Sequence, residues 1–152
     1  MINSDDLEAF GYYESYEDYK EQKRVRGMTP LQMVREFATT MGQPLDQPCM
    51  YDEDYEDSEL EGLRFGLIFE EFSEFEEATD KQNLMKELAD LVYVCYGYAA
   101  TYGMDLDAIL ADTHRNNMER CIWPDGTIHR SDEGKILKNP DHPKLSLQKY
   151  VW

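Results

Sequence analysis

Two long segments with apolar residues at helical spacing constrain the fold of this chain more than any other feature. The first runs from about residue 58 to 78 and the second from about 81 to 103, with a short polar link between them. In both segments apolar residues recur every three or four positions, which is typical of an α-helix with one buried face. Because the link is short, we expect two long antiparallel helices that lie side by side.

Capping residues predict further helices around this pair. Thr29 followed by Pro30 is a helix start, with Thr29 as the N-cap. Asp80 caps the second long helix, and Asp105 caps another that ends near residue 120. No segment alternates polar and apolar residues over a long stretch, so strands are not expected. The fold class is therefore all-α, a bundle of four to five helices, with an irregular C-terminal arm or small hairpin from about residue 121.

The length of 152 residues fits one domain. We place this domain at residues 29–152. Residues 1–28 form a polar N-terminal extension in which Tyr12, Tyr13, Tyr16 and Tyr19 recur at roughly helical spacing, which indicates a short peripheral helix.

The net charge of −17 disfavours binding to nucleic acid or to anionic lipid, because both are polyanions. No apolar run is long enough to span a membrane, and the acidic N-terminal residues do not resemble a signal peptide. Cys49, Cys95 and Cys121 are odd in number and widely spaced, which argues against disulfides and a cysteine zinc site. We therefore expect a cytoplasmic protein with no membrane or nucleic-acid partner.

Apolar stripes on the two long helices predict which faces are buried. At about 100° per residue, Leu60, Leu63 and Leu67 share one face of the first helix. The face of the second helix is formed by four residues, Leu84, Leu88, Leu91 and Cys95. We expect these two stripes to face the core.

Five carboxylates lie in or beside these stripes. They are Glu70, Glu71 and Glu74 on the first helix, and Glu87 and Asp90 on the second. The two sets are at similar distances from the link, so antiparallel packing brings them to one level at about 1.5 Å of rise per residue.

Crowded carboxylates at the edge of a core repel one another and lose hydration, and divalent cations relieve both costs. A site made of carboxylates, with no histidine at the matching spacing, favours Mg²⁺, or Mn²⁺ in its place, over zinc or iron. The alternative is that these acids are ordinary surface residues, since single ExxE and ExxD motifs are common.

The pattern Glu70-Glu71-x-x-Glu74, twelve intervening residues, Glu87-x-x-Asp90 resembles the EExxE…ExxD signature of the all-α nucleoside triphosphate pyrophosphohydrolases. This superfamily includes MazG, dimeric dUTPases and phosphoribosyl-ATP pyrophosphohydrolases. Further segments are similar to the phage-type, MazG-like branch, over about residues 29–147. They are Arg64-x-x-Leu67-Ile68, the stretch from Leu91 to Gly97, His114 to Arg120, and Gly134-Lys135-x-x-Lys138. Asn116 and Arg120 depart from the residues usual in that branch.

The resemblance implies Mg²⁺-dependent hydrolysis of an NTP or dNTP between the α and β phosphates, giving NMP and pyrophosphate. It implies that Glu71, Glu74, Glu87 and Asp90 hold the metal and that Glu70 activates the attacking water. Candidate substrate-binding residues are Lys86, Asn117, Arg120, Lys135, Lys138, His114 and Tyr93, although each could equally be an ordinary surface or core residue. Residues 29–152 are then a MazG-like catalytic domain.

Partners and rival functions remain open at this point. We expect a nucleoside triphosphate substrate and a homo-oligomer, a dimer or a tetramer, but the sequence names neither base nor sugar. One alternative is a non-enzymatic acidic protein that mimics nucleic acid. A di-iron bundle is disfavoured because it needs Glu-x-x-His pairs. Within the enzyme class, a dUTPase or a phosphoribosyl-ATP pyrophosphohydrolase would use the same carboxylates.

Overall fold

The computed structural model describes residues 15–151, which contain five α-helices and no β-strand. The helices are α2 (Tyr16–Arg26), α3 (Pro30–Thr40), α4 (Ser58–Glu76), α5 (Lys81–Thr101) and α6 (Leu106–Cys121), followed by a 3₁₀ turn at Gln148–Tyr150. The all-α fold class is therefore confirmed. None of the described helices is long and apolar enough to cross a membrane.

The helices begin at the capping residues that the sequence indicates. The Thr29 hydroxyl accepts a hydrogen bond from the Gln32 backbone N–H, and the Gln32 side chain accepts one from the Thr29 N–H. Asp80 accepts from the Asn83 N–H at the start of α5, and Asp105 accepts at the start of α6. These caps satisfy N–H groups that have no partner within a helix.

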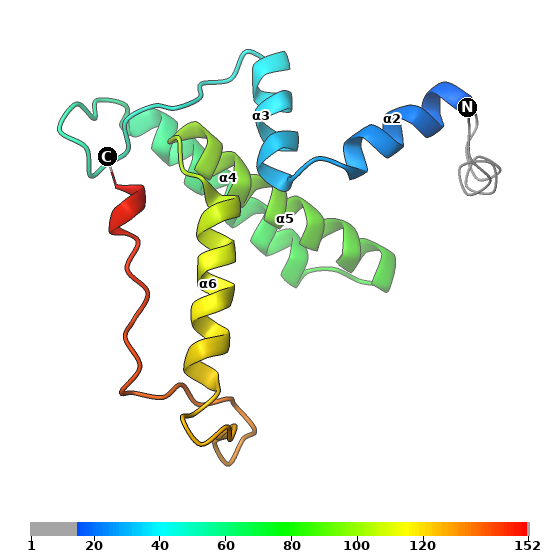
Figure 1. Cartoon of the computed structure of the whole chain (residues 1–152). Coiled ribbons are helices and arrows are strands. Elements are labelled where there is room, and N and C mark those ends of the chain that lie inside the picture. Colours follow the sequence, from blue (N-terminus) through cyan, green and yellow to red (C-terminus); the bar gives the residue numbers. More distant parts are fainter. Residues whose placement is uncertain (1–14, 152) are drawn as a thin grey trace, which may run out of the picture.

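α4 and α5 lie antiparallel and side by side, and α3 packs across α5 (Figure 1). The core where α3, α5 and α6 meet is built from Val34, Tyr96 and Ala100, with Leu31 and Leu106 packed around it. Beyond this core α6 points away from the α4–α5 pair, and α2 extends in another direction (Figure 1). Within the described residues, an apolar core thus lies toward the C-terminal end of α5.

The prediction that the leucine stripes face the core holds only in part. Leu60, Leu67, Leu91 and Cys95 are half-buried, but Leu63, Leu84 and Leu88 are exposed. Leu63 is 57% exposed and Leu88 is 48% exposed, while Glu61, Arg64 and Glu87 are buried. A helical wheel identifies an apolar face, but it cannot say which face a neighbouring helix covers. The contact between α4 and α5 combines buried charged residues with an aromatic contact, since the ring centroids of Phe65 on α4 and Tyr98 on α5 lie 5.3 Å apart. Buried polar groups are generally hydrogen-bonded.

Glu61 shows how this polar contact is stabilised. The Tyr55 hydroxyl donates to one carboxylate oxygen of Glu61 at 2.6 Å, and the Tyr98 hydroxyl donates to the other at 3.1 Å. The hydrogen bond to Glu61 raises the pKa of Tyr55 to about 12. Tyr98 lies on α5, so this carboxylate links the two helices directly.

The segment after α6 forms a small turn and then runs back along its own helix (Figure 1). An isolated antiparallel bridge joins Arg130 and Ile136, which is the minimal form of the expected hairpin. Further along, Lys149 Nζ lies 2.6 Å from Asp112 on α6, and the Tyr150 hydroxyl donates to the same carboxylate at 2.7 Å. The arm is thus anchored to α6 of the same chain.

The expected N-terminal helix corresponds to α2, which begins after the cap Ser15. Tyr12 and Tyr13, which belong to the predicted tyrosine pattern, lie outside the described residues. The division at residues 28 and 29 into an extension and a domain stays a prediction.

We expect Tyr98→Phe to lower the free energy of unfolding by about 1–3 kcal/mol, because the buried Glu61 oxygen loses its donor without gaining water. Chemical denaturation followed by circular dichroism measures the change. Tyr51→Phe is the matched control, since Tyr51 is 88% exposed. Equal stability of the two variants would contradict a stabilising role for the Glu61 contact.

Candidate active site

Three of the predicted metal ligands converge between α4 and α5. Glu71 and Glu74 come from α4 and Glu87 from α5, and one carboxylate oxygen of each lies within 4.8 Å of the others. Glu87 is only 4% exposed, Glu71 is half-buried and Glu74 is exposed. The antiparallel packing of α4 and α5 therefore brings the two motifs to one level, as the sequence indicates.

Two side chains of α5 contact the buried Glu87. The Asn83 amide donates to Glu87 Oε1 at 2.7 Å, and Lys86 Nζ lies 3.0 Å from Glu87 Oε2. Asn83 also accepts a hydrogen bond from the Thr79 N–H through its side-chain oxygen, so its rotamer is held at both ends. Asn83 is not among the residues predicted from the sequence, although its position four residues before Glu87 puts it on the same helix face.

Glu71 has an unsatisfied oxygen. Its Oε2 atom is buried and has no hydrogen-bond partner. Burial, followed by repulsion from Asp90, raises the pKa of Glu71. A hydrogen bond with Glu87 and repulsion from the same carboxylate raise the pKa of Glu74.

These observations fit a bound cation. A buried carboxylate oxygen without a donor, set beside two further carboxylates, is stabilised by positive charge and destabilised by its absence. The donor set consists of oxygen atoms alone, which suits a hard divalent ion.

Glu70 and Asp90 flank this group without joining it. Glu70 is exposed on α4 next to Glu71. Asp90 lies on α5, where its carboxylate is 2.8 Å from Lys86 Nζ. Their catalytic and metal-binding roles stay predictions.

The remaining predicted residues lie apart from the carboxylates within a single chain. His114, Asn117 and Arg120 are on α6, which points away from the α4–α5 pair, and Lys135 and Lys138 follow in the arm beyond it (Figure 1). Arg120 contacts the arm, since its backbone carbonyl accepts from the Asn139 N–H at 2.8 Å. Any contact of these residues with a substrate at the carboxylates therefore requires a second chain or a large movement.

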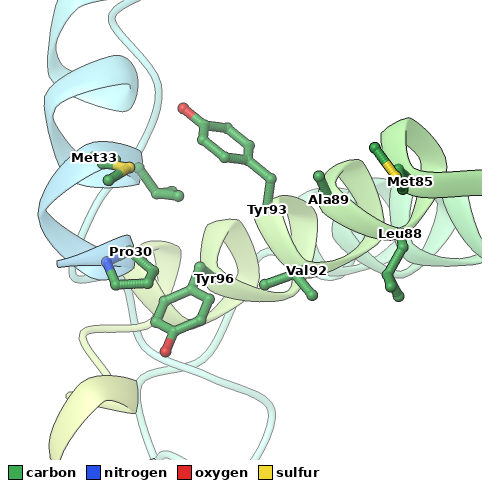
Figure 2. Close-up of a pocket in the computed structure, with 9 residues that line it drawn as sticks. Pro30, Met33, Met85, Leu88, Ala89, Val92, Tyr93 and Tyr96 are labelled. Carbon is green, nitrogen blue, oxygen red and sulfur yellow. The ribbon is translucent and has the colours of Figure 1, made fainter. Parts of the chain in front are cut away.

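Tyr93 is also separate from the carboxylates, on a different face of α5. It lines an apolar groove between α3 and α5 together with Met33 and Val92 (Figure 2). Its ring packs edge-on against Phe37 of α3, with 6.0 Å between the ring centroids. Burial raises the pKa of Tyr93.

The chain is similar to known proteins over its helical part. The profile of the phosphoribosyl-ATP pyrophosphohydrolase family matches residues 34–117, just over half of the chain. This match includes α4, α5 and all five predicted carboxylates. An uncharacterized protein of Acanthamoeba polyphaga mimivirus is 34% identical over 82 residues, which are 52% of this chain and 33% of that protein. The chain thus spans about a third of this relative's length.

The pH dependence of stability provides a test of the crowded carboxylates. The raised pKa of Glu71 means that its protonated form is favoured in the folded state. Its contribution to folding is thus fully present below its ordinary pKa of 4.5 and is lost as pH rises through the raised value. In EDTA, we expect Glu71→Gln to unfold at a higher temperature than the wild type at pH 7, and to lose less stability between pH 5 and pH 7.

Thermal unfolding at several pH values measures this difference, with Glu76→Gln at the exposed end of α4 as the control. Mg²⁺ at 100 times its dissociation constant should stabilise the wild type by about 2.7 kcal/mol, and Glu71→Gln by less. Glu76→Gln keeps Glu71 and should follow the wild type. A wild type that gains stability between pH 5 and pH 7 in EDTA, or that responds to pH as Glu71→Gln does, would contradict the prediction.

Proposed function

The chain belongs to the phosphoribosyl-ATP pyrophosphohydrolase family, and from this membership we propose that it cleaves a nucleoside triphosphate between the α and β phosphates. The products are a nucleoside monophosphate and pyrophosphate. Within the wider superfamily we assign it to the MazG-like, phage-type branch, with residues 29–152 as the catalytic domain. The motifs from Arg64 to Lys138 support this finer assignment.

One observation carries the proposal. The oxygen atoms of Glu71, Glu74 and Glu87 lie within 4.8 Å of one another, and one of them is buried without a hydrogen-bond partner. A protein that only mimics nucleic acid would display its acids on an open surface. Glu87 is instead buried between two helices, which favours a site for a cation over an exposed acidic surface.

We assign Glu71, Glu74, Glu87 and Asp90 as the residues that hold Mg²⁺. When bound, the metal neutralises charge on the phosphate oxygens and polarises the scissile bond. Asn83 keeps the Glu87 carboxylate in one orientation through its 2.7 Å hydrogen bond.

Glu70 has the remaining role in the proposed reaction. It lies next to Glu71 but outside the three-carboxylate group, and we assign it to activate the attacking water. The oxygen of a water molecule forms a bond to the α phosphorus while Glu70 takes the proton. The bond from the α phosphorus to the bridging oxygen breaks, and pyrophosphate leaves with that electron pair.

Phosphoribosyl-ATP is the second candidate substrate, and the family match is the observation that favours it. The same carboxylates would serve, because the bond cleaved is again a phosphoanhydride next to the α phosphorus. Phosphoribosyl-ATP differs from ATP only in the phosphoribosyl group that its adenine base carries.

We further propose that the chain forms a homo-oligomer. The groove between α3 and α5 has a volume of about 380 Å³ and a lining that is almost wholly apolar, including Met85, Leu88 and Val92 (Figure 2). Phe65, Phe69 and Phe72 are exposed on a second apolar surface, on α4. Exposed apolar surface of this extent is typical of protein interfaces. A second copy would cover it and could bring the basic residues of α6 and the arm toward the carboxylates.

Pyrophosphate release from the common NTPs and dNTPs and from phosphoribosyl-ATP tests the function directly. We expect release with Mg²⁺, none with EDTA, and a loss of roughly 100-fold or more in Glu74→Gln, since several kcal/mol of charge stabilisation are removed. Glu76→Gln, on the same helix, should retain wild-type rates. Glu70→Gln should lose turnover but still bind Mn²⁺, which separates a base from a ligand. No release from any substrate would overturn the proposal.

The mass in solution tests the oligomer. We expect light scattering to give a multiple of the 17.9 kDa chain mass for the wild type and the single-chain mass for Leu88→Glu, which places a charge in the groove. Ile128→Glu is the control, because Ile128 is also exposed but lies in the arm. A monomeric wild type would exclude the proposed interface.

A further inference from the structure

Lys86 lies where the proposed site needs a cation. Its Nζ atom is 2.8 Å from Asp90 Oδ2, and 3.0 and 3.2 Å from the two carboxylate oxygens of Glu87. The ammonium group thus contacts one member of the three-carboxylate group and the neighbouring carboxylate at once. A divalent ion on Glu87 and Asp90 would compete for the same oxygen lone pairs.

The surroundings of Lys86 allow its side chain to move. The side chain is 63% exposed, although it contacts the buried Glu87. Beside it is an open polar hollow of about 490 Å³, lined by Asp80, Gln82, Asn83 and Lys86. The four-carbon stem of a lysine is flexible, so the ammonium group can leave the carboxylates and enter this space without any change in the helix.

We infer that Lys86 exchanges between two anionic partners, the Glu87 and Asp90 carboxylates in the metal-free protein and the phosphate chain of the substrate once a divalent cation has displaced it. This inference rests on the proposed function and adds an order of events to it. While the ammonium group occupies the carboxylates it weakens metal binding. Once released, it lies next to the place where the substrate's phosphates must meet the metal, and it supplies positive charge to a strongly acidic chain.

One variant tests both parts of the inference, because it should bind the metal more tightly and pyrophosphate more weakly. Lys86→Ala removes the competitor, so we expect Mn²⁺ to bind about three- to tenfold more tightly, the size expected for an ion pair with one buried partner. The same variant removes a phosphate contact, so pyrophosphate should bind about three- to tenfold more weakly at saturating Mg²⁺. In EDTA, pyrophosphate should not distinguish the variant from the wild type.

Mn²⁺ binding is measured by electron paramagnetic resonance and pyrophosphate binding by calorimetry, on the full-length chain. Lys81→Ala is the matched control, because Lys81 is an exposed lysine at the start of the same helix. It removes the same charge at a greater distance, where solvent and salt screen it, so its Mn²⁺ affinity should change less than about twofold. Circular dichroism checks that each variant is folded.

Each other outcome overturns the inference in a recognisable way. Unchanged or weaker Mn²⁺ binding in Lys86→Ala would show that Lys86 is an ordinary surface ion-pair residue or a support for Glu87. If Lys86→Ala binds pyrophosphate as tightly as the wild type does, Lys86 does not contact the phosphates. Both results leave the proposed function intact if the wild type binds Mn²⁺ and releases pyrophosphate. A wild type that binds no Mn²⁺ would refute the metal site itself, and the inference with it.

Discussion

A polar contact between two long antiparallel helices is the constraint on which the rest of this structure depends. Glu61 and Arg64 of α4 and Glu87 of α5 are buried, and the ring of Phe65 on α4 packs against Tyr98 on α5. A buried carboxylate costs several kcal/mol unless hydrogen bonds or opposite charge compensate it. Two tyrosine hydroxyls compensate Glu61, and an amide and an ammonium group compensate Glu87.

The compensation is incomplete, since Arg64, Glu71 and Tyr102 each keep a buried polar atom without a hydrogen-bond partner. The proposed chemistry follows from the carboxylate among them. Glu71 keeps a buried oxygen without a donor, and burial and neighbouring acids raise its pKa. Cation binding is favourable at such a site, because the positive charge offsets the desolvation and repulsion of the carboxylates in the folded chain. Lys86 supplies part of this positive charge through its contacts with Glu87 and Asp90. These contacts therefore compete with metal binding.

The polar contact also decides which surfaces remain exposed. With charged residues buried between α4 and α5, several large apolar side chains stay exposed, among them Leu63, Phe69 and Phe72 on α4 and Leu88 in the groove beside α3. The chain thus presents apolar surface on the helices that carry its carboxylates. A second copy that covers this surface would exclude water close to the site, and it would account for the placement of α6 and the arm away from the carboxylates of their own chain.

The sequence by itself determined the helices, their caps at Thr29, Asp80 and Asp105, and the meeting of Glu71 and Glu74 with Glu87, because periodicity, capping chemistry and a short link are local properties. It did not determine which helix faces pack together. It predicted a buried Leu63, which is exposed, and it did not predict the burial of Glu61 and Arg64 or the hydrogen bond from Asn83. The direction of α6 and the course of the arm were likewise decided only by tertiary packing. A helical wheel shows the polarity of each helix face. Whether a face is buried depends on which other helix packs against it, and contacts between residues distant in the chain decide that.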